Sequence, residues 1–150
     1  NNIGIWGHSM GGGISIRVIT VNADVKAAVL YGSMNADERV NLERMSYWAR
    51  TRGDPTRVPE LGTLDADLRR ISPVYYLDRI TAAVSIHHSE ADPTVPVEWS
   101  IDLCKRLQDL KKSVECFTYK GEPHTMIGPG DVLFRQRVIQ FYDKHLKGKQ

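Results

Sequence analysis

This sequence has few of the features that mark specialised classes of protein. Its two cysteines, Cys104 and Cys116, are too few for a disulfide scaffold and lack metal-ligand spacing relative to any pair of histidines. No stretch approaches the roughly 18 consecutive apolar residues of a membrane span, and neither an internal repeat nor a low-complexity tract is present. Both cysteines lie on the apolar side of their predicted elements. We therefore expect two buried free thiols and a fold that needs no disulfide.

An excess of charge of one sign is also missing. The 150 residues include 20 basic and 18 acidic side chains, a formal net charge of +2, and the two signs are interspersed. Such a surface offers no basic stripe for nucleic acid and no acidic tail. We therefore expect no nucleic-acid partner.

What the sequence does contain is a nucleophile motif, Gly7-His8-Ser9-Met10-Gly11, between an apolar run and a helical pattern. A serine projects its hydroxyl from a sharp strand-to-helix turn, and such a turn crowds neighbouring side chains unless they are glycine. We expect that crowding at Gly7 and Gly11. The context predicts a nucleophile elbow with Ser9 at its tip, although serine is also favoured as a plain helix N-cap.

Two later loops supply an acid and a base, in the chain order serine, acid, histidine that α/β-hydrolases use. The strand predicted over Ala82 to His87 leads into a loop with Asp92, at the sheet edge where catalytic groups collect. The strand predicted over Val114 to Tyr119 leads into a loop with His124. We predict Asp92 as the acid and His124 as the base. Asp37, which follows an earlier strand, is the alternative acid.

Four other histidines compete with His124. His8 lies in the elbow and is expected to line the substrate pocket, whereas His145 falls in a helical stripe. His87 and His88 end a strand, where packing or loop hydrogen bonds account for them. Because adjacent strand residues point to opposite faces of a sheet, this pair does not predict a metal site, and we expect no metal or other cofactor.

These residues carry a resemblance that covers nearly the whole chain. The sequence resembles the C-terminal half of an α/β-hydrolase, above all the prolyl oligopeptidase and dienelactone hydrolase branch of bacterial serine hydrolases. The matching pieces are GHSMGGG at 7–13, Ile71-Ser72-Pro73, His88-Ser89-Glu90-Ala91-Asp92 with Val95-Pro96, and Gly121-Glu122-Pro123-His124. Two positions depart from the pattern. Met10 stands where the branch's peptidases usually have tyrosine, and Ser89 stands where glycine usually follows the histidine.

The resemblance implies a mostly parallel sheet flanked by helices, with several further strands before the elbow. We therefore expect that the chain begins within the fifth strand of a longer protein and exposes an apolar strand edge. It would associate through that edge, as a homodimer or with its N-terminal segment. The backbone N–H of Met10 is the expected first donor of an oxyanion hole. The second donor belongs to an upstream loop, so the chain alone is expected to be a poor catalyst.

The remaining pattern alternates between strand and helix, as in an α/β fold. A helix is predicted over 10–21, with Ile14, Val18 and Val21 as its buried stripe, and a strand over 25–31. Two later helices carry apolar stripes, formed by Leu103, Cys104, Leu107 and Leu110, and by Phe134, Val138, Phe141, Tyr142 and His145.

Residues 34–72 interrupt this alternation and are too long for a plain crossover. We interpret them as a small cap inserted into a single catalytic domain spanning 1–150. The cap and nearby loops are expected to form an apolar or amphipathic substrate pocket from Met34, Trp48 and Tyr75, together with His8.

These features predict a serine hydrolase with a small ester or peptide as its substrate. The apolar pocket favours a carboxylic ester, cleaved through an acyl-enzyme intermediate, so a carboxylesterase is the first hypothesis. A serine peptidase of the prolyl oligopeptidase type is the second, with selectivity set by an N-terminal region. The third is a non-catalytic structural half that works only with its missing strands. The location of the protein in the cell stays open.

Overall fold

The computed structural model describes residues 2–51 and 65–147. Four strands form one sheet in the order β1-β2-β3-β4, and all neighbouring strands are parallel. The strands are β1 (Ile3–His8), β2 (Val25–Tyr31), β3 (Ala83–Ser89) and β4 (Val114–Tyr119). The helices that follow strands directly are α1 (Met10–Val21), α4 (Val97–Asp109) and α5 (Pro129–Leu146). The predicted α/β class is confirmed.

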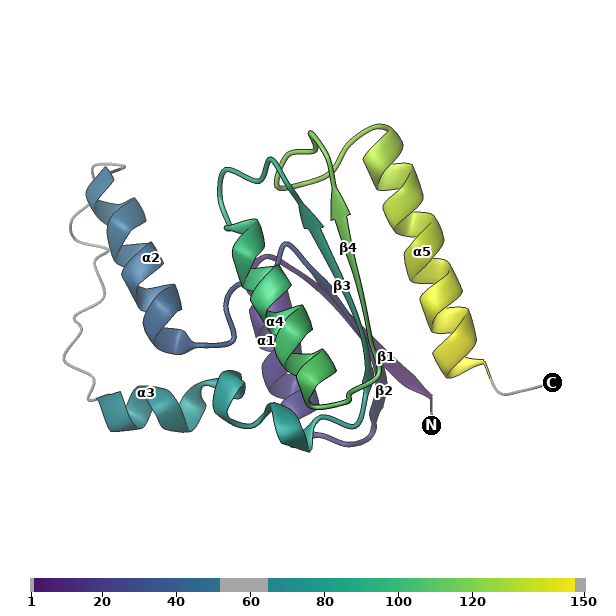
Figure 1. Ribbon diagram of the computed structural model, residues 1–150, viewed down its shortest axis with the longest axis horizontal. Helices are drawn as coiled ribbons and strands as arrows, with labels where there is room; N and C mark the ends of the chain where they lie inside the picture. The colour runs from purple at the N-terminus through teal and green to yellow at the C-terminus, as the bar shows by residue number, and fades with distance from the viewer. Residues whose placement is uncertain (1, 52–64, 148–150) are drawn as a thin grey trace.

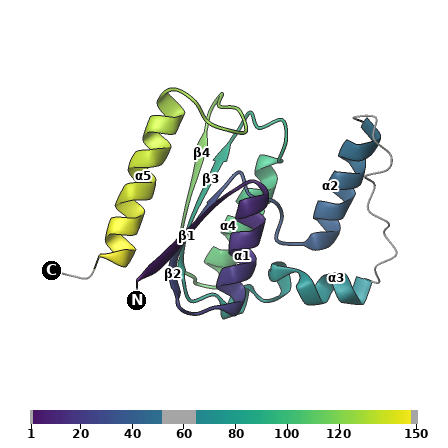
Figure 2. The same ribbon diagram turned by 180° about the vertical axis from the view of Figure 1, so that it is seen from behind.

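The sheet is the middle layer of three, as the two opposite views show (Figures 1 and 2). Helices α1 and α4 cover one face, where Ile16 and Leu107 belong to the same core as Leu30. Helix α5 covers the other face, where Phe134 packs with Val29. Val29 and Leu30 enter different cores because successive strand residues point to opposite faces. Burial on both faces therefore explains the apolar run of β2.

The buried face of α1 differs from the predicted stripe. Ile16 and Ile19 are buried, whereas Ile14 is 51% exposed and Val21 is 81% exposed. The glycines at the start of the helix explain the difference. Gly12 lies so close to the turn after β2 that a Cβ atom on Gly12 would collide with that turn. This close approach orients α1 so that the face carrying Ile16 lies against the sheet.

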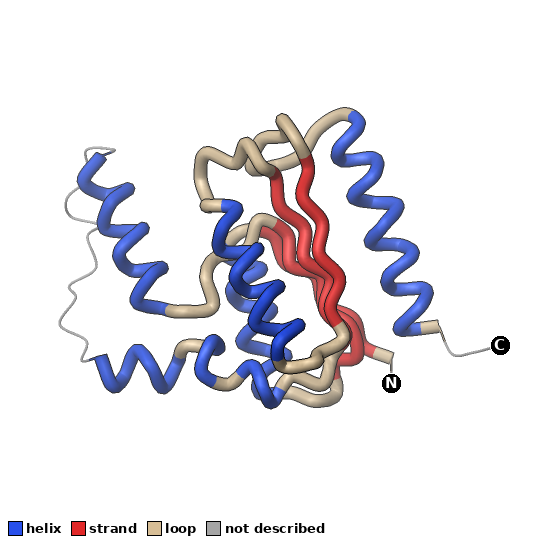
Figure 3. The backbone as a smooth tube through the Cα atoms, viewed as in Figure 1, coloured by secondary structure: helices blue, strands red, loops and turns tan. Residues whose placement is uncertain are grey.

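Between β2 and β3 the chain forms α2 (Glu38–Thr51) and α3 (Asp65–Ile71), then the short helical turns η2 (Pro73–Tyr75) and η3 (Leu77–Arg79). Helices α2 and α3 contact each other and project from the sheet on the side of α1 and α4 (Figure 3). They belong to the segment interpreted as a cap, of which residues 52–64 lie outside the described part of the chain. A cap function for this segment stays a prediction. In the described ranges, no helix has both the length and the apolar character to cross a membrane.

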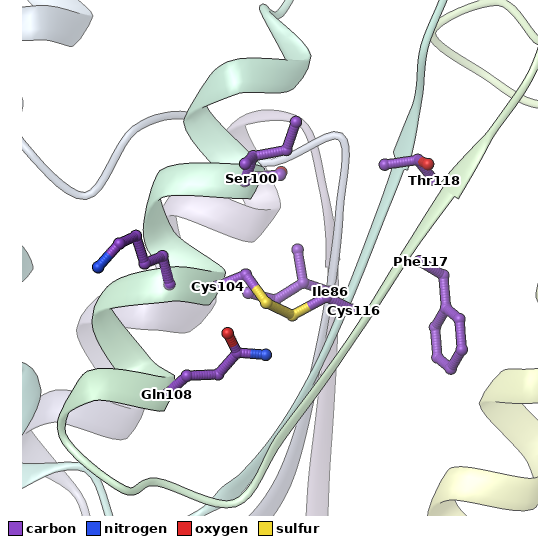
Figure 4. A pocket seen from close by; sticks show the side chains of 9 residues that line it. Ile86, Ser100, Cys104, Gln108, Cys116, Phe117 and Thr118 are labelled. Atoms are coloured by element: carbon purple, nitrogen blue, oxygen red, sulfur yellow. A yellow bond between two sulfur atoms is a disulfide. The ribbon is translucent and has the colours of Figure 1, made fainter.

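The two cysteines form a disulfide, so the prediction of two free thiols is wrong. Cys104 of α4 and Cys116 of β4 are bonded, with their Cα atoms 6.4 Å apart (Figure 4). Both residues lie on the apolar side of their elements, as predicted. Apolar patterning identifies the layer that each thiol enters, but it does not give the distance between two thiols in that layer. The bond fastens α4 to the strand at one edge of the sheet.

We expect reduction of this disulfide to lower the free energy of unfolding by about 3 kcal/mol, because a bond between residues 12 apart restricts the unfolded chain. Urea unfolding with and without a reductant measures the difference. The double variant Cys104→Ala/Cys116→Ala is the control, and its stability should not respond to the reductant. Equal stability of the oxidised and reduced wild type would contradict the expectation.

Strand β1 lies at the other edge of the sheet and, within the described residues, pairs only with β2. Its side chains Ile3 and Trp6 are 43% and 51% exposed. An apolar edge with open N–H and C=O groups favours pairing with another strand.

Association of this chain through β1 therefore stays our prediction, and sedimentation velocity tests it. Ile3→Lys should raise the fraction of monomer, because it places a charge at the paired edge. Ile101→Lys, at a residue that is 54% exposed on α4, is the matched control and should not change the association. A wild-type chain that stays monomeric at high concentration would show that β1 is protected in another way.

Candidate active site

Ser9 occupies the turn between β1 and α1 in a strained backbone conformation, with φ 57° and ψ −118°. Such a conformation costs a residue with a Cβ atom about 1–3 kcal/mol and occurs mainly at functional sites. The Ser9 N–H donates to the Tyr31 carbonyl at 2.9 Å, and the Ser9 carbonyl accepts from the Met34 N–H at 3.1 Å. The end of β2 therefore holds the turn in place. The Ser9 side chain makes no capping hydrogen bond to α1, which disfavours the N-cap interpretation.

The glycine that this elbow requires is Gly7. A Cβ atom on Gly7 would collide with the Gly11 carbonyl, whereas a Cβ atom on Gly11 would meet nothing within 4 Å. The prediction of crowding at Gly11 is therefore wrong. The crowding is at Gly7, where the end of β1 closely approaches the first turn of α1.

Asp92 and His124 meet from the loops that follow β3 and β4. His124 Nδ1 donates to Asp92 Oδ2 at 2.6 Å, and the Asp92 side chain is 1% exposed. The backbone N–H groups of Thr94 and Val95 donate to Asp92 Oδ1 at 2.7 and 2.9 Å. One carboxylate oxygen therefore holds the loop, and the other holds the imidazole.

The charge state of Asp92 follows from these contacts. Burial by itself would raise the pKa of the Asp92 carboxyl, but the hydrogen bonds from His124, Val95 and Thr94 outweigh it, and the pKa lies below its ordinary value. Asp92 is therefore ionised at neutral pH. An ionised acceptor favours the His124 tautomer with its proton on Nδ1, which leaves Nε2 free to accept a proton.

Asp37, the alternative acid, makes different contacts. Its Oδ1 accepts from the Arg39 N–H at 2.9 Å, and its Oδ2 accepts from the Tyr75 hydroxyl at 3.5 Å. These contacts place Asp37 at the beginning of α2. The geometry therefore favours Asp92 as the partner of His124.

The loop that carries His124 is held by a buried carboxylate that the sequence reasoning did not single out. Glu122 accepts from the backbone N–H groups of Ile127 at 3.0 Å and Gly130 at 2.9 Å, at the beginning of α5. The Ser89 hydroxyl donates to the Glu122 carbonyl. Ser89, one of the two departures from the family pattern, thus ties the end of β3 to the loop of His124.

His8 supports the same loop from the side of the elbow. Its Nε2 donates to the His124 carbonyl at 3.0 Å, and the two rings lie 4.6 Å apart between centroids. The His8 ring also stacks on Tyr31 at 4.3 Å. The Tyr31 hydroxyl in turn accepts from the Met126 N–H. The structure therefore brings His8 to the candidate site, next to the predicted base.

Gly32 is a further site residue that the sequence reasoning missed. It has a φ of 49°, and a Cβ atom there would lie 3.3 Å from His124 Cε1 and 3.5 Å from Asp92 Oδ2. Only glycine adopts this conformation readily and leaves that space empty. In the sequence, the feature that indicates Gly32 is its position directly after an apolar strand, at the same sheet edge as Ser9.

Two of the other residues predicted for the substrate pocket belong to different elements, Trp48 to α2 and Tyr75 to η2. The Arg44 guanidinium packs on the Trp48 ring, with Arg44 Cζ 5.3 Å from the ring centroid. Arg44 Nη2 also donates to the Thr94 carbonyl at 3.0 Å. This contact links α2 to the loop of Asp92. Tyr75 instead lies beneath Arg69, at 4.6 Å, and its hydroxyl faces the beginning of α2. Arg44, which packs on Trp48, therefore contacts the loop of Asp92, whereas Tyr75 contacts Arg69 and Asp37.

Met34 and Met10 flank the serine. The Met34 backbone N–H donates to the Ser9 carbonyl, so Met34 lies beside the elbow, and its role in the substrate pocket stays a prediction. Met10 is the first residue of α1, and its side chain is 70% exposed. At this position a backbone N–H has no acceptor within the helix and lies at the positive end of the helix dipole.

His87 lies on the opposite face of β3 from the candidate site. It is fully buried, and its ring nitrogens lie 2.8 Å from both the Ser85 and the Tyr119 hydroxyls. Burial, together with a smaller effect of the charge of Arg137, lowers the pKa of the His87 imidazole to about 3. The structure therefore gives His87 a role in packing, in line with the sequence interpretation.

This burial predicts acid sensitivity. As the pH falls below about 6.5, the unfolded chain takes up a proton that folded His87 refuses until about pH 3, so stability is lost across that window. The free energy of unfolding should fall by about 2 kcal/mol by pH 5. Urea unfolding at pH 7 and pH 5 measures it, and His87→Gln should show a smaller loss. Equal losses in both proteins would rule out His87 as the cause.

Comparison with known proteins agrees with this architecture. The parallel sheet, the helices on both faces and the elbow define an α/β-hydrolase fold. The chain matches the family model of the prolyl oligopeptidase family over residues 1–149, and it belongs to that family. The predicted resemblance is thereby confirmed. No curated protein sequence matches the chain.

Solved structures with the same fold include two peptidases and an esterase. A puromycin-hydrolysing peptidase of Mycobacterium tuberculosis is 24% identical with a TM-score of 0.82, over 97% of this chain and 22% of that one. An acylaminoacyl peptidase of Pyrococcus horikoshii is 20% identical with a TM-score of 0.77, over 99% of this chain and 25% of that one. An esterase of Pyrococcus furiosus is 17% identical with a TM-score of 0.71, over 97% of this chain and 55% of that one. The chain thus spans a quarter or less of the two peptidases.

Proposed function

We propose that this chain carries the catalytic triad of a serine hydrolase, with Ser9 as nucleophile, His124 as general base and Asp92 as the acid that orients it. The observation that carries the proposal is the 2.6 Å hydrogen bond between His124 Nδ1 and Asp92 Oδ2. It lies at the sheet edge at which Ser9 is held in a strained turn. Membership of the prolyl oligopeptidase family supports the same chemistry.

The proposed reaction has two steps. His124 Nε2 accepts the proton of the Ser9 hydroxyl as Oγ attacks the substrate carbonyl carbon, and Asp92 stabilises the resulting imidazolium. The tetrahedral intermediate then expels the leaving group, which takes that proton from His124. In the second step His124 deprotonates a water molecule that attacks the acyl-enzyme. The second tetrahedral intermediate then expels Ser9 Oγ, which takes this proton back from His124 as the acid is released.

The negative charge on the carbonyl oxygen requires hydrogen-bond donors. The Met10 N–H is the proposed donor within this chain, because the first turn of α1 leaves it without a helical acceptor. Loss of one such donor typically lowers the rate by about a hundredfold to a thousandfold. The contribution of a second donor therefore decides how active the chain is.

A peptide or related amide is the substrate class that the comparisons favour. The family is that of prolyl oligopeptidase, and two of the structures with this fold are named as peptidases. Most of each peptidase chain has no counterpart in this chain. The proposal therefore assigns the cleavage chemistry, and not the choice of peptide, to this chain.

A carboxylic ester is the second candidate. The Pyrococcus furiosus esterase has this fold with a TM-score of 0.71. Met10, in place of the tyrosine usual in the branch's peptidases, is a departure that favours this alternative. An apolar side chain at that position cannot donate a hydrogen bond from a hydroxyl to a substrate amide.

Matched substrates separate the candidates. The same acyl groups, one of them ending in proline, are offered as p-nitrophenyl esters and as p-nitroanilides. Turnover of the anilides supports the peptidase, and turnover of the esters alone supports the esterase. If a fluorophosphonate also fails to label Ser9, both are contradicted, and the chain is then a structural half without activity of its own.

A further inference from the structure

We propose that His88 is a positioning residue for Asp92, and that it helps to fix the carboxylate oxygen that His124 binds. His88 is the residue of β3 next to His87, and its side chain is fully buried. Its Nε2 lies 3.0 Å from the Val95 carbonyl and 3.3 Å from Asp92 Oδ2. The inference deepens the proposed function, because it rests on Asp92 as the acid of the triad.

The hydrogen-bond partners of His88 define its tautomer. The Val95 carbonyl and the Asp92 carboxylate only accept hydrogen bonds, so His88 Nε2 carries the proton. Its Nδ1 lies 2.6 Å from the Ser100 hydroxyl. In a neutral ring Nδ1 is then the acceptor, and the Ser100 hydroxyl donates to it.

Burial keeps this ring neutral. Desolvation lowers the pKa of the His88 imidazole, and this effect exceeds the opposing effects of the Val95 carbonyl and of Asp92. His88 therefore presents a fixed N–H dipole rather than a charge to Asp92 Oδ2. A positive charge at this position would compete with the imidazolium of His124 for the same carboxylate oxygen.

Two hydrogen bonds and one close polar contact link His88, Val95 and Asp92. His88 holds the carbonyl of Val95, and the N–H of Val95 holds Asp92 Oδ1 at 2.9 Å. Asp92 Oδ2 lies between the two histidines, 2.6 Å from His124 Nδ1 and 3.3 Å from His88 Nε2. Rotation of the carboxylate would break the contact of Oδ1 with Val95 and the contacts of Oδ2 with the two histidines. His88 thus restricts Asp92 to the orientation that His124 needs.

Helix α4 in turn fixes His88. Ser100 lies one helical turn before Cys104, whose disulfide fastens α4 to β4 (Figure 4). Ser100 is buried, so its hydroxyl is shielded from competition by water. Contacts therefore run from Ser100 of α4 to His88 and from His88 to Asp92, so that His88 acts on the triad from outside it. His87 points to the other face of the sheet and shares none of these partners.

A pair of substitutions at one position tests the proposal. The His88→Gln amide reaches the place of Nε2 and can still donate to Val95 and Asp92, whereas the shorter His88→Asn amide reaches only toward Ser100. The first readout is the rate constant for fluorophosphonate labelling of Ser9. We expect His88→Asn to lower it about tenfold or more and His88→Gln to retain most of it. His87→Asn, the adjacent buried histidine on the opposite face, should lower stability without lowering the labelling rate.

The second readout does not depend on Ser9. The proton on His124 Nδ1 should give a low-field NMR signal that disappears in His124→Gln. We expect this signal to survive in His88→Gln and to broaden or move upfield in His88→Asn, because Asp92 loses its second support. If Ser9 is unreactive in the wild type, the proposed function fails, and the NMR signal still decides the role of His88.

Ser100→Ala covers the case in which His88→Asn does not fold. It removes the partner that orients His88, and we expect it to change the NMR signal and the labelling rate in the same direction but by less. The proposal is overturned if a folded His88→Asn keeps the wild-type signal and labelling rate. It is also overturned if His88→Gln and His88→Asn lose both equally, since His88 would then only fill space.

Discussion

Replacing Ser9 by alanine should abolish hydrolysis, with a fall in turnover on the order of a millionfold. Ser9 is the proposed nucleophile, and neither His124 nor Asp92 can replace its covalent step. The fold should remain, because the contacts of Ser9 with Tyr31 and Met34 are made by its backbone. Turnover of the matched ester and anilide substrates measures the first effect. Circular dichroism and thermal unfolding measure the second.

Ser113→Ala is the control for Ser9→Ala. Ser113 is exposed and precedes β4, where its backbone carbonyl accepts from Val84. Its substitution should leave turnover at the wild-type level. Substantial turnover in Ser9→Ala would show that another residue, or a contaminating hydrolase, is responsible.

Asp92→Asn should lower turnover by about ten-thousandfold while the protein stays folded. The side-chain carbonyl oxygen of the introduced asparagine can still accept from Thr94 and Val95, which places its amide nitrogen where Asp92 Oδ2 now lies. That nitrogen donates hydrogen bonds, so His124 must present an unprotonated Nδ1 to it. The proton then moves to Nε2, and His124 can no longer accept the proton of Ser9.

Asp37→Asn is the matched control, because Asp37 was the alternative acid. Its carboxylate accepts from the Arg39 backbone N–H and the Tyr75 hydroxyl, so we expect turnover within a few-fold of the wild type. The pattern to be measured is a large loss in Asp92→Asn and a small one in Asp37→Asn. The reverse pattern would move the acid to Asp37.

The sequence was sufficient to predict the sheet and the place of the candidate site. Apolar runs of strand length separated by helical stripes indicate parallel strands, and the carboxyl ends of parallel strands meet at one edge. Ser9, Asp92 and His124 all follow such ends, so the sequence predicts that they lie at the same edge of the sheet. The chain order of serine, acid and histidine added specificity.

Other features depend on distances that a one-dimensional pattern does not contain. The disulfide requires that α4 approach β4 to within 6.4 Å at one pair of residues. The buried face of α1 depends on how closely Gly12 approaches the neighbouring turn. The proposed role of His88 depends on a loop that brings both the Val95 carbonyl and the Asp92 carboxylate close to its Nε2 atom. In each case several placements fit the same pattern, and tertiary packing selects one.

The most direct test of the triad is to locate a phosphonate adduct on the wild-type protein. A fluorophosphonate reacts rapidly only with an activated serine. Mass spectrometry of the intact chain and fragmentation of its tryptic peptides then identify the modified residue. We expect one adduct per chain, on Ser9, and none on Ser15 in the same tryptic peptide. An adduct on another serine, or substrate turnover that persists with Ser9 unmodified, would contradict it.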